Sequence, residues 1–231
     1  MANNYFEFKQ FTIWQQHCAM KVGTDGTLLG AWADGGERIL DVGTGTGLIA
    51  LMMAQRFPSA QVVGVDIDEK AVGQASQNVA TAPFSHRVRI EQADANILEG
   101  SYDCVVSNPP FFEKSLTCLD NQRTMARHDD GFSYAALFEL GKRVLTAHGK
   151  LSLVAPADYR SRVLEEASLH GFFLHRECAV KTTPQKQPRR YLFCFALSSA
   201  ASIDSGTGVI EDAPGVRSEW YRQLTDDFYI K

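Results

Sequence analysis

The chain has 231 residues, of which 45% are hydrophobic and 22% are charged, as in an ordinary globular protein. Its formal net charge of −4 argues against a protein that coats nucleic acid by overall charge, so a polynucleotide partner would need a local basic surface. No apolar run is long enough to cross a bilayer and residues 1–5 carry no signal-peptide pattern, so we expect a cytoplasmic protein without membrane contact.

The cysteines and histidines indicate neither a disulfide framework nor a metal site. The five cysteines are an odd number, and no two of them have the Cys-x-x-Cys spacing. Two of them fall inside apolar strand patterns, where a free thiol behaves as a small buried hydrophobe. The six histidines add no metal-ligand spacing, so we expect reduced thiols and no bound metal.

Strand-like and helix-like segments alternate from residue 38 onward. The expected strands are, in chain order, 38–42, 61–66, 88–92, 102–107, 150–155, 172–181 and 189–197. The expected helices are 48–56, 69–81, 134–145 and 158–170. Such alternation indicates right-handed βαβ units, so we expect an α/β, Rossmann-like fold with a mainly parallel seven-stranded sheet and helices on both faces.

The remaining segments fit a single domain that spans the whole chain. The short proline-containing loop 182–188 joins the last two strands, which predicts a C-terminal antiparallel hairpin at the sheet edge. Residues 1–36 form an N-terminal extension, and 209–231 form a helical tail whose N-cap is Ser218. Residues 198–208 are rich in Ser, Ala and Gly and are expected to be a flexible connector.

A glycine-rich turn follows the first expected strand, with Gly43, Gly45 and Gly47. Such a turn alone is weak evidence, because any tight strand-to-helix turn favours glycine. A dinucleotide fingerprint would need glycine where this chain has Leu48, and a pyrophosphate prefers a helix N-terminus without a carboxylate such as Asp41 nearby. S-adenosylmethionine has no phosphate but carries an ammonium and a sulfonium group, so Asp41 favours this cofactor.

Two further aspartates follow the second and third expected strands. Asp66 lies 23 residues after Gly43, where nucleotide-binding α/β folds bind the ribose hydroxyls. Asp94 is placed to accept a hydrogen bond from an adenine amino group. Each aspartate alone could equally be a helix cap or a turn residue. Together with the glycine turn, they favour a cofactor site beyond the carboxyl ends of the strands.

The fourth expected strand ends in the tetrapeptide Asn108-Pro109-Pro110-Phe111. Adjacent prolines fix the backbone and lack N–H donors, so this turn is rigid and presents carbonyl oxygens. The Asn108 side-chain oxygen and the Pro109 carbonyl could bind both hydrogens of a planar amine, which localises its lone pair for methylation. Phe111 offers a face on which an unpaired or flipped base could stack. The alternative is a Pro-Pro turn that only ends the strand and has no role in binding. The position of the tetrapeptide at the end of a strand makes this alternative the less favoured one.

The glycine turn and the tetrapeptide resemble class I S-adenosylmethionine-dependent methyltransferases that act on amino groups. The runs Phe-Lys-Gln-Phe at 8–11 and Lys-Val-Gly-Thr-Asp-Gly-Thr-Leu-Leu-Gly-Ala-Trp at 21–32 narrow the resemblance to the bacterial tRNA(Val) adenine-37 N6-methyltransferase family. It covers nearly the whole chain. The resemblance implies the class I methyltransferase fold, S-adenosylmethionine as cofactor, and methylation of adenine 37 on N6 in a tRNA anticodon loop.

The resemblance also implies that residues 21–26 cover the methionine end of the cofactor, with Lys21 and Thr24 as contacts. From the residues alone, Thr24 and Asp25 could equally cap a short helix over 26–32, and the two roles are compatible. We expect the protein to act as a monomer.

The expected RNA contacts rest on charge alone. Residues 112–133 form a long loop without periodicity, which is expected to act as a lid or a substrate-binding segment. Its cationic candidates are Lys114, Arg123, Arg127 and His128. The loop between the last two strands has no acidic residue nearby and offers Lys181, Lys186, Arg189 and Arg190. For this second segment a solvated hairpin tip is an equal alternative.

Other functions share parts of this pattern. A protein glutamine N5-methyltransferase faces the same lone-pair problem, but such enzymes usually carry an additional N-terminal helical domain, and only residues 1–36 precede this sheet. Another RNA amino-methyltransferase, such as one that modifies rRNA guanine, remains open. An inactive protein that keeps the fold and cofactor is disfavoured by the intact Asp41, Asp66 and Asn108, and a dinucleotide oxidoreductase by Leu48.

Overall fold

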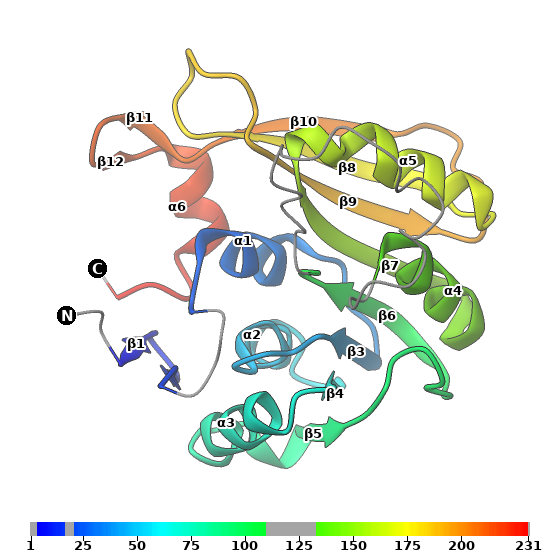
Figure 1. Cartoon of the computed structure of the whole chain (residues 1–231). Coiled ribbons are helices and arrows are strands. Elements are labelled where there is room, and N and C mark those ends of the chain that lie inside the picture. Colours follow the sequence, from blue (N-terminus) through cyan, green and yellow to red (C-terminus); the bar gives the residue numbers. More distant parts are fainter. Residues whose placement is uncertain (1–3, 17–20, 110–132, 231) are drawn as a thin grey trace, which may run out of the picture.

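An eight-stranded sheet forms the centre of the computed structural model, which describes residues 4–16, 21–109 and 133–230 (Figure 1). The strands lie in the order β10 (Asp204–Val209), β8 (Phe173–Lys181), β9 (Arg190–Ala196), β7 (Leu145–Pro156), β6 (Tyr102–Ser107), β3 (Arg38–Val42), β4 (Gln61–Asp66) and β5 (Val88–Gln92). Strands β5, β4, β3, β6 and β7 are mutually parallel, whereas β9 is antiparallel to both β7 and β8. The expected α/β fold is confirmed.

Helices cover both faces of this sheet. They are α1 (Thr24–Trp32), α2 (Leu48–Arg56), α3 (Glu69–Ala80), α4 (Tyr134–Val144), α5 (Arg160–Leu169) and α6 (Glu219–Thr225). Successive residues of a strand point to opposite faces. Accordingly, Ile39 of β3 packs in one hydrophobic cluster with α1 and α2, and Leu40 packs in a second cluster with α4 and α5.

Two details of the predicted sheet are wrong. The sheet has eight strands rather than seven, because part of the expected connector 198–208 belongs to β10, which pairs with β8 in parallel. The hairpin of β8 and β9 therefore does not form the edge of the sheet. The sequence pattern of β10 hides it, since its first four residues are exposed and polar or glycine. Gly208 is required there, because a Cβ would lie 2.3 Å from the Trp220 ring.

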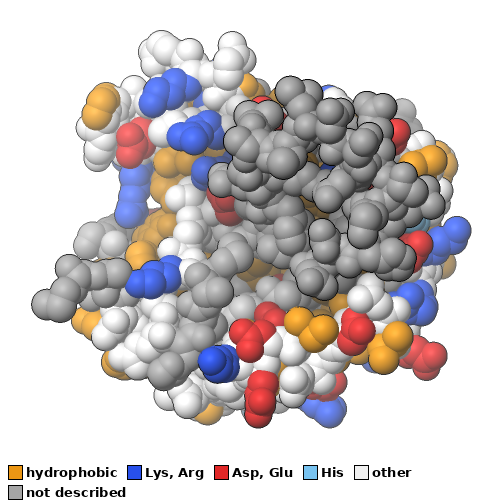
Figure 2. Space-filling view, in the orientation of Figure 1, with side chains coloured by type: hydrophobic (Ala, Val, Ile, Leu, Met, Phe, Trp, Pro, Cys, Tyr) orange, Lys and Arg blue, Asp and Glu red, His pale blue; other side chains and the backbone are white. Residues whose placement is uncertain are grey.

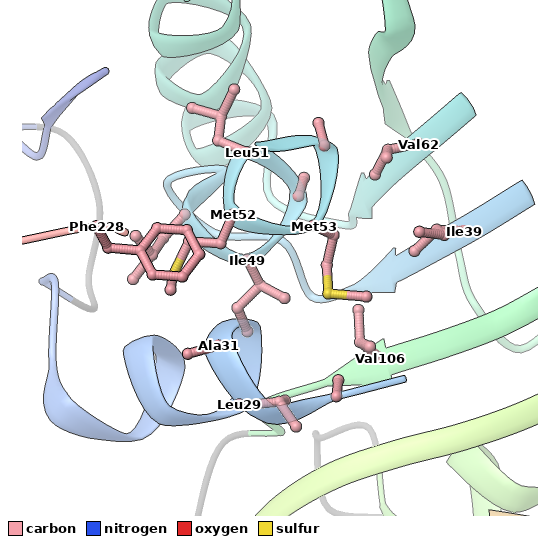
Figure 3. Packing of buried hydrophobic residues seen from close by; sticks show 14 of the residues in the cluster. Leu29, Ala31, Ile39, Ile49, Leu51, Met52, Met53, Val62, Val106 and Phe228 are labelled. Carbon is pink, nitrogen blue, oxygen red and sulfur yellow. The ribbon is translucent and has the colours of Figure 1, made fainter. Parts of the chain in front are cut away.

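Helix α2 holds the turn that precedes it in a fixed place. Its first seven residues, 48–54, are all buried, as expected for a helix that is apolar all round. Figure 3 shows Met53 of α2 pointing towards Ile39 and Val106 of the sheet, with α1 packed beside α2. Gly30 allows this close approach of α1, because a Cβ there would lie 2.8 Å from the Met52 sulfur.

The described segments nearest to the two chain ends pack on the same face as α1 and α2. Strands β1 (Tyr5–Glu7) and β2 (Thr12–Trp14) form a hairpin that the sequence did not predict. A second unpredicted hairpin, β11 (Glu211–Ala213) with β12 (Val216–Arg217), precedes α6. Ser218 is the N-cap of α6, as expected, since its side chain accepts from the Tyr221 N–H. Phe228 buries its ring in the α1–α2 cluster.

Asn78 on α3 joins the N-terminal hairpin to the glycine turn. Its side-chain amide donates to the Trp14 carbonyl at 2.9 Å and to the Thr46 carbonyl at 2.8 Å, and its oxygen accepts from the Trp14 N–H at 2.9 Å. The residue is fully buried, and both its amide nitrogen and its side-chain oxygen are hydrogen-bonded. The conformation of the turn is therefore tied to the docking of the N-terminal extension.

Asn78→Ala is expected to lower the free energy of unfolding by about 2–4 kcal/mol, because it removes the partner of the buried Thr46 carbonyl and of the part-buried backbone groups of Trp14. Chemical denaturation followed by circular dichroism measures this change. Ser76→Ala, an exposed position on the same helix, should change stability by less than about 0.5 kcal/mol. Equal denaturation midpoints for the two variants would contradict this account of Asn78.

The described cysteines are free thiols, as expected. Cys104, Cys178 and Cys194 are buried and unbridged. Burial raises the pKa of Cys178 and of Cys194 to about 11, so both stay protonated and serve as packing residues. Cys18 and Cys118 lie outside the described residues.

Candidate active site

The parallel strands bring the predicted cofactor residues to one edge of the sheet. Because β3, β4, β5 and β6 run in the same direction, their carboxyl ends meet at a common edge, here called the carboxyl edge. The glycine turn follows β3 at this edge, and the tetrapeptide follows β6 next to it. Asp66 ends β4, and Asp94 follows β5.

The glycine turn adopts a conformation that other residues would resist. Gly43, Gly45 and Gly47 have φ angles of 69°, 56° and 79°, in the left-handed region. The N–H groups of Gly43 and Thr44 both donate to the Val65 carbonyl at 2.9 Å, which ties the turn to the end of β4. Gly47 is the N-cap of α2, so the turn leads directly into the buried helix.

Asp41 lies at the head of the turn and is completely buried. Its Oδ2 accepts from the Thr44 hydroxyl at 2.7 Å and from the Ala50 N–H at 3.0 Å. Its Oδ1 is buried and accepts no hydrogen bond from the described residues. Burial raises the pKa of Asp41 to about 7, although the two hydrogen bonds oppose this rise. One oxygen therefore shapes the turn, and the other is an acceptor that a cationic or N–H-bearing ligand could satisfy.

Asp66 and Asp94 also make bonds within the protein. Asp66 accepts from the Gly45 N–H at 2.9 Å through Oδ2 and from the Asp68 N–H at 3.0 Å through Oδ1. Asp94 Oδ1 accepts from the Asn96 N–H at 2.8 Å and from its side-chain amide at 2.9 Å. The turn-forming role is thus real for both residues. It does not exclude ligand binding, because a carboxylate has about four lone-pair positions.

Asn108 presents an unused acceptor beside the glycine turn. Ser107, at the end of β6, donates from its hydroxyl to the Val42 carbonyl at 2.9 Å and so joins the ends of β6 and β3. The next residue, Asn108, has a buried Oδ1 that accepts no hydrogen bond from the described residues. Pro109 is buried. Pro110 and Phe111 lie outside the described residues, so their predicted roles stay predictions.

The N-terminal segment reaches the same region through α1. Gly26, in the first turn of α1, lies so close to α2 that a Cβ would be 3.2 Å from Leu48. Lys21 is exposed just before this turn. The predicted capping role of Thr24 is wrong: α1 begins at Thr24 itself, and its N-cap is Gly23, which makes no side-chain cap. The helix therefore starts two residues earlier than the expected 26–32, with the extended backbone of Gly23 as its N-cap.

The basic candidates of the β8–β9 loop lie at the carboxyl edge as well. Strand β8 runs parallel to β7, since both are antiparallel to β9, so the loop between β8 and β9 lies at this edge. Lys186 and Arg189 are exposed there. Figure 2 shows Lys and Arg side chains gathered around this loop.

Arg190 differs from these two residues. Its Nε lies 2.7 Å from Asp25 Oδ1 in the first turn of α1, and both side chains are largely covered. The other predicted cations, Lys114, Arg123, Arg127 and His128, lie outside the described residues.

Polar residues that the sequence did not single out support this site. They are Gln15, which accepts from the Val22 N–H at 2.8 Å, together with Asn78 and Ser107. Asn78 carried a usable signal, because it falls on the otherwise buried face of α3. Gln15 and Ser107 have no such signal, since a short strand or turn gives no period against which a polar residue stands out.

Two possible features do not occur in the described part of the chain. No helix within residues 4–16, 21–109 and 133–230 is long and apolar enough to cross a membrane. Among the same residues, no group of three or more His, Cys, Asp or Glu side chains is arranged to hold a metal ion.

The acceptors at the carboxyl edge fit S-adenosylmethionine. Three carboxylates lie at or near the ends of neighbouring strands there: Asp41 near the end of β3, Asp66 at the end of β4, and Asp94 just after β5. A pyrophosphate would be repelled by this set, whereas hydroxyl, amino and ammonium groups would be bound. The unpaired Oδ1 atoms of Asp41 and Asn108 in particular call for donors from a ligand, since buried acceptors are rarely left unsatisfied.

Comparison with known proteins identifies the family. Residues 26–183 match the model of the methyltransferase small domain. A Bacteroides thetaiotaomicron protein named tRNA1(Val) (adenine(37)-N6)-methyltransferase is 44% identical over 100% of this chain and 99% of its own length. A Phocaeicola vulgatus protein of the same name is 45% identical with the same coverage.

Among solved structures, a predicted O-methyltransferase from Agrobacterium tumefaciens has a TM-score of 0.71 over 88% of this chain and 96% of its own. It is only 18% identical and so supports the fold alone. The chain therefore belongs to the methyltransferase small domain family and, within it, to the family of proteins named tRNA1(Val) (adenine(37)-N6)-methyltransferase.

Proposed function

We propose that this chain transfers a methyl group from S-adenosylmethionine to N6 of adenine 37 in the anticodon loop of tRNA(Val), as the names of its relatives state for them. The observation that carries the proposal is the buried, unpaired Oδ1 of Asn108 next to a glycine turn with three carboxylates. This arrangement offers a hydrogen-bond acceptor for an amine beside the glycine turn, where the methyl-bearing end of the cofactor would lie.

The cofactor would be held along the carboxyl edge. Asp66 would accept the ribose hydroxyls, and Asp94 the adenine amino group. The glycine turn allows the ligand to approach the backbone closely, and the free Oδ1 of Asp41 would face its cationic end, as would Thr24 in the first turn of α1. S-adenosylmethionine supplies an electrophilic methyl group on its sulfonium.

Asn108 would prepare the amine that accepts this methyl group. An exocyclic amine on an aromatic ring is a weak nucleophile, because its lone pair is delocalised into the ring. Asn108 Oδ1 and the Pro109 carbonyl would each accept one of its two hydrogens, so the nitrogen becomes pyramidal and its lone pair points towards the methyl group. A carboxamide cannot take a full proton, so the proton leaves after transfer, when the methylated nitrogen is acidic.

The target base must leave its stack to reach this acceptor. We propose that Phe111 stacks on it. The exposed cations of the β8–β9 loop, Lys186 and Arg189, would hold the phosphates of the anticodon stem and loop. Arg123 and Arg127 are further candidates for such contacts.

The double charge reversal Lys186→Glu with Arg189→Glu is expected to weaken tRNA binding at least about tenfold at 0.1 M salt and to reduce the slope of log K against log salt by about 2. Binding isotherms at several salt concentrations measure both quantities. Lys142→Glu, a single charge reversal, is the control, because Lys142 is exposed near the end of α4 that leads to the opposite edge of the sheet. If the control and the double variant lose affinity equally, the loop is not the RNA contact.

The class of methyl acceptor is tested by comparing three possible substrates of the protein under the same conditions. The protein is incubated with S-adenosylmethionine labelled in its methyl group and, separately, with tRNA, with rRNA and with a glutamine-bearing protein substrate. The proposal predicts label in tRNA alone. Label in rRNA or in protein would replace it with one of the other amino-group methylations.

A further inference from the structure

Asp25 and Arg190 form a partly buried ion pair between α1 and β9. Arg190 Nε lies 2.7 Å from Asp25 Oδ1, and the two side chains are only 21% and 27% exposed. The contact is a close pairing of charges rather than an aligned hydrogen bond, since Asp25 Oδ1 accepts no hydrogen bond of good geometry from the described residues. Partly buried pairs of this kind are screened less by water and salt than pairs on the surface.

The Arg190 end of the pair is rigid. Its backbone pairs with Pro156 of β7 on one side and with Val180 of β8 on the other, so its position is set by three strands. The preceding residue, Arg189, is exposed, and its side chain forms no ion pair with the described residues. The two adjacent arginines thus differ: Arg190 forms the covered ion pair with Asp25, whereas the charge of the exposed Arg189 acts on Asp25 only through space.

The Asp25 end lies in the turn of α1 that borders the glycine turn. Gly26, the next residue, packs against Leu48 in the first turn of α2, and α2 begins directly after Gly47. The first turn of α1 has no side-chain cap of its own. The ion pair is therefore a tertiary contact that fixes this turn from outside.

We propose that Arg190 is a positioning residue for the cofactor site and not an RNA contact: paired with Asp25, it holds the first turn of α1 against the glycine turn. In this way the base of the β8–β9 loop is coupled to the site. The inference rests on the proposed function only in taking S-adenosylmethionine as the ligand. Removing either charge leaves its partner covered and unpaired, which costs more than the loss of a surface pair.

The pair is tested by measuring S-adenosylmethionine binding calorimetrically, without RNA. Asp25→Asn and Arg190→Gln are each expected to weaken binding about fivefold to tenfold, and the double variant no more than the worse single variant, because both remove one interaction. Exchanging the charges, with Asp25→Arg and Arg190→Asp together, should restore affinity to within about threefold of the unmodified chain. A loss that came from altered packing at either position, and not from the pair of charges, would not be restored by exchange.

Arg189→Gln is the matched control. It should lower the salt slope of tRNA binding by about 1 and leave the affinity for S-adenosylmethionine unchanged. Arg190→Gln, in contrast, should weaken S-adenosylmethionine binding and leave the salt slope unchanged. The inference is overturned if Arg190→Gln lowers the salt slope as Arg189→Gln does, or if the exchanged pair binds no better than the worse single variant.

Thermal unfolding without ligand identifies variants that do not fold. If Arg190→Gln does not fold, Asp25→Asn takes its place, because it removes the pair and leaves both arginines as they are: cofactor affinity as strong as in the unmodified chain would overturn the inference. Failure of the proposed function looks different, because the unmodified chain would then bind S-adenosylmethionine and methylate no tRNA.

Discussion

Asn108→Ala is expected to lower kcat for methyl transfer by at least about 10²–10³-fold, the usual cost of removing a hydrogen-bonding group that acts in the transition state. Affinity for S-adenosylmethionine should stay within about twofold, because the group acts on the acceptor amine. The unpaired Oδ1 of Asn108 supports this division of roles, since the folded protein uses it for nothing else among the described residues. Single-turnover kinetics with saturating cofactor and tRNA measure the chemical step directly.

Asn108→Asp is the conservative comparison. It keeps an acceptor oxygen at the same place, so its rate should lie between those of the unmodified chain and Asn108→Ala. If Asn108→Ala instead weakens cofactor binding as much as it lowers the rate, Asn108 holds the cofactor and the proposed role in amine activation is wrong.

Asp66→Ala is expected to weaken S-adenosylmethionine binding about 100-fold. The variant loses the charged acceptor proposed for the ribose hydroxyls, and hydrogen bonds to a charged group contribute about 1.5–3 kcal/mol each. It also removes the hydrogen bond that the Gly45 N–H donates to Asp66 Oδ2 at 2.9 Å. Isothermal titration without RNA gives the affinity.

Asp68→Ala separates cofactor binding from local stability. Asp68 is the N-cap of α3, where its side chain accepts from the Lys70 N–H, only two residues from Asp66. Its loss should lower stability by about 1 kcal/mol and leave the affinity for S-adenosylmethionine nearly unchanged. An equal loss of affinity in both variants would assign Asp66 a role in the fold alone.

The central strands and the position of the glycine turn could be predicted because local pattern and tertiary structure agree there. Residues 38–42 and 61–66 are short apolar runs bounded by turns, and both become strands with the predicted bounds. The apolar run at 48–56 likewise forms α2. In each case the element is buried on both sides, and such burial requires a run of apolar residues that can be recognised in the sequence.

Backbone pairing and partners distant in the sequence could not be predicted. Strand β10 joins the sheet through backbone hydrogen bonds to β8, which Asp, Ser, Gly and Thr side chains do not reveal. Charge alone grouped Arg189 with Arg190, yet only Arg190 meets Asp25, which comes from the other end of the chain. For Asp66 and Asp94 the sequence left a turn role and a cofactor role open, and the structure shows the turn-forming hydrogen bonds of both residues.

The most direct test of the proposed activity identifies the nucleotide of the tRNA that receives the methyl group. A tRNA(Val) transcript is treated with the protein and S-adenosylmethionine, digested with a specific ribonuclease, and its fragments are analysed by mass spectrometry. One N6-methyladenosine is predicted, in the anticodon-loop fragment that contains adenine 37, and none in a transcript with guanine there. Methylation at another base, or equal methylation of the guanine transcript, would contradict the proposed activity.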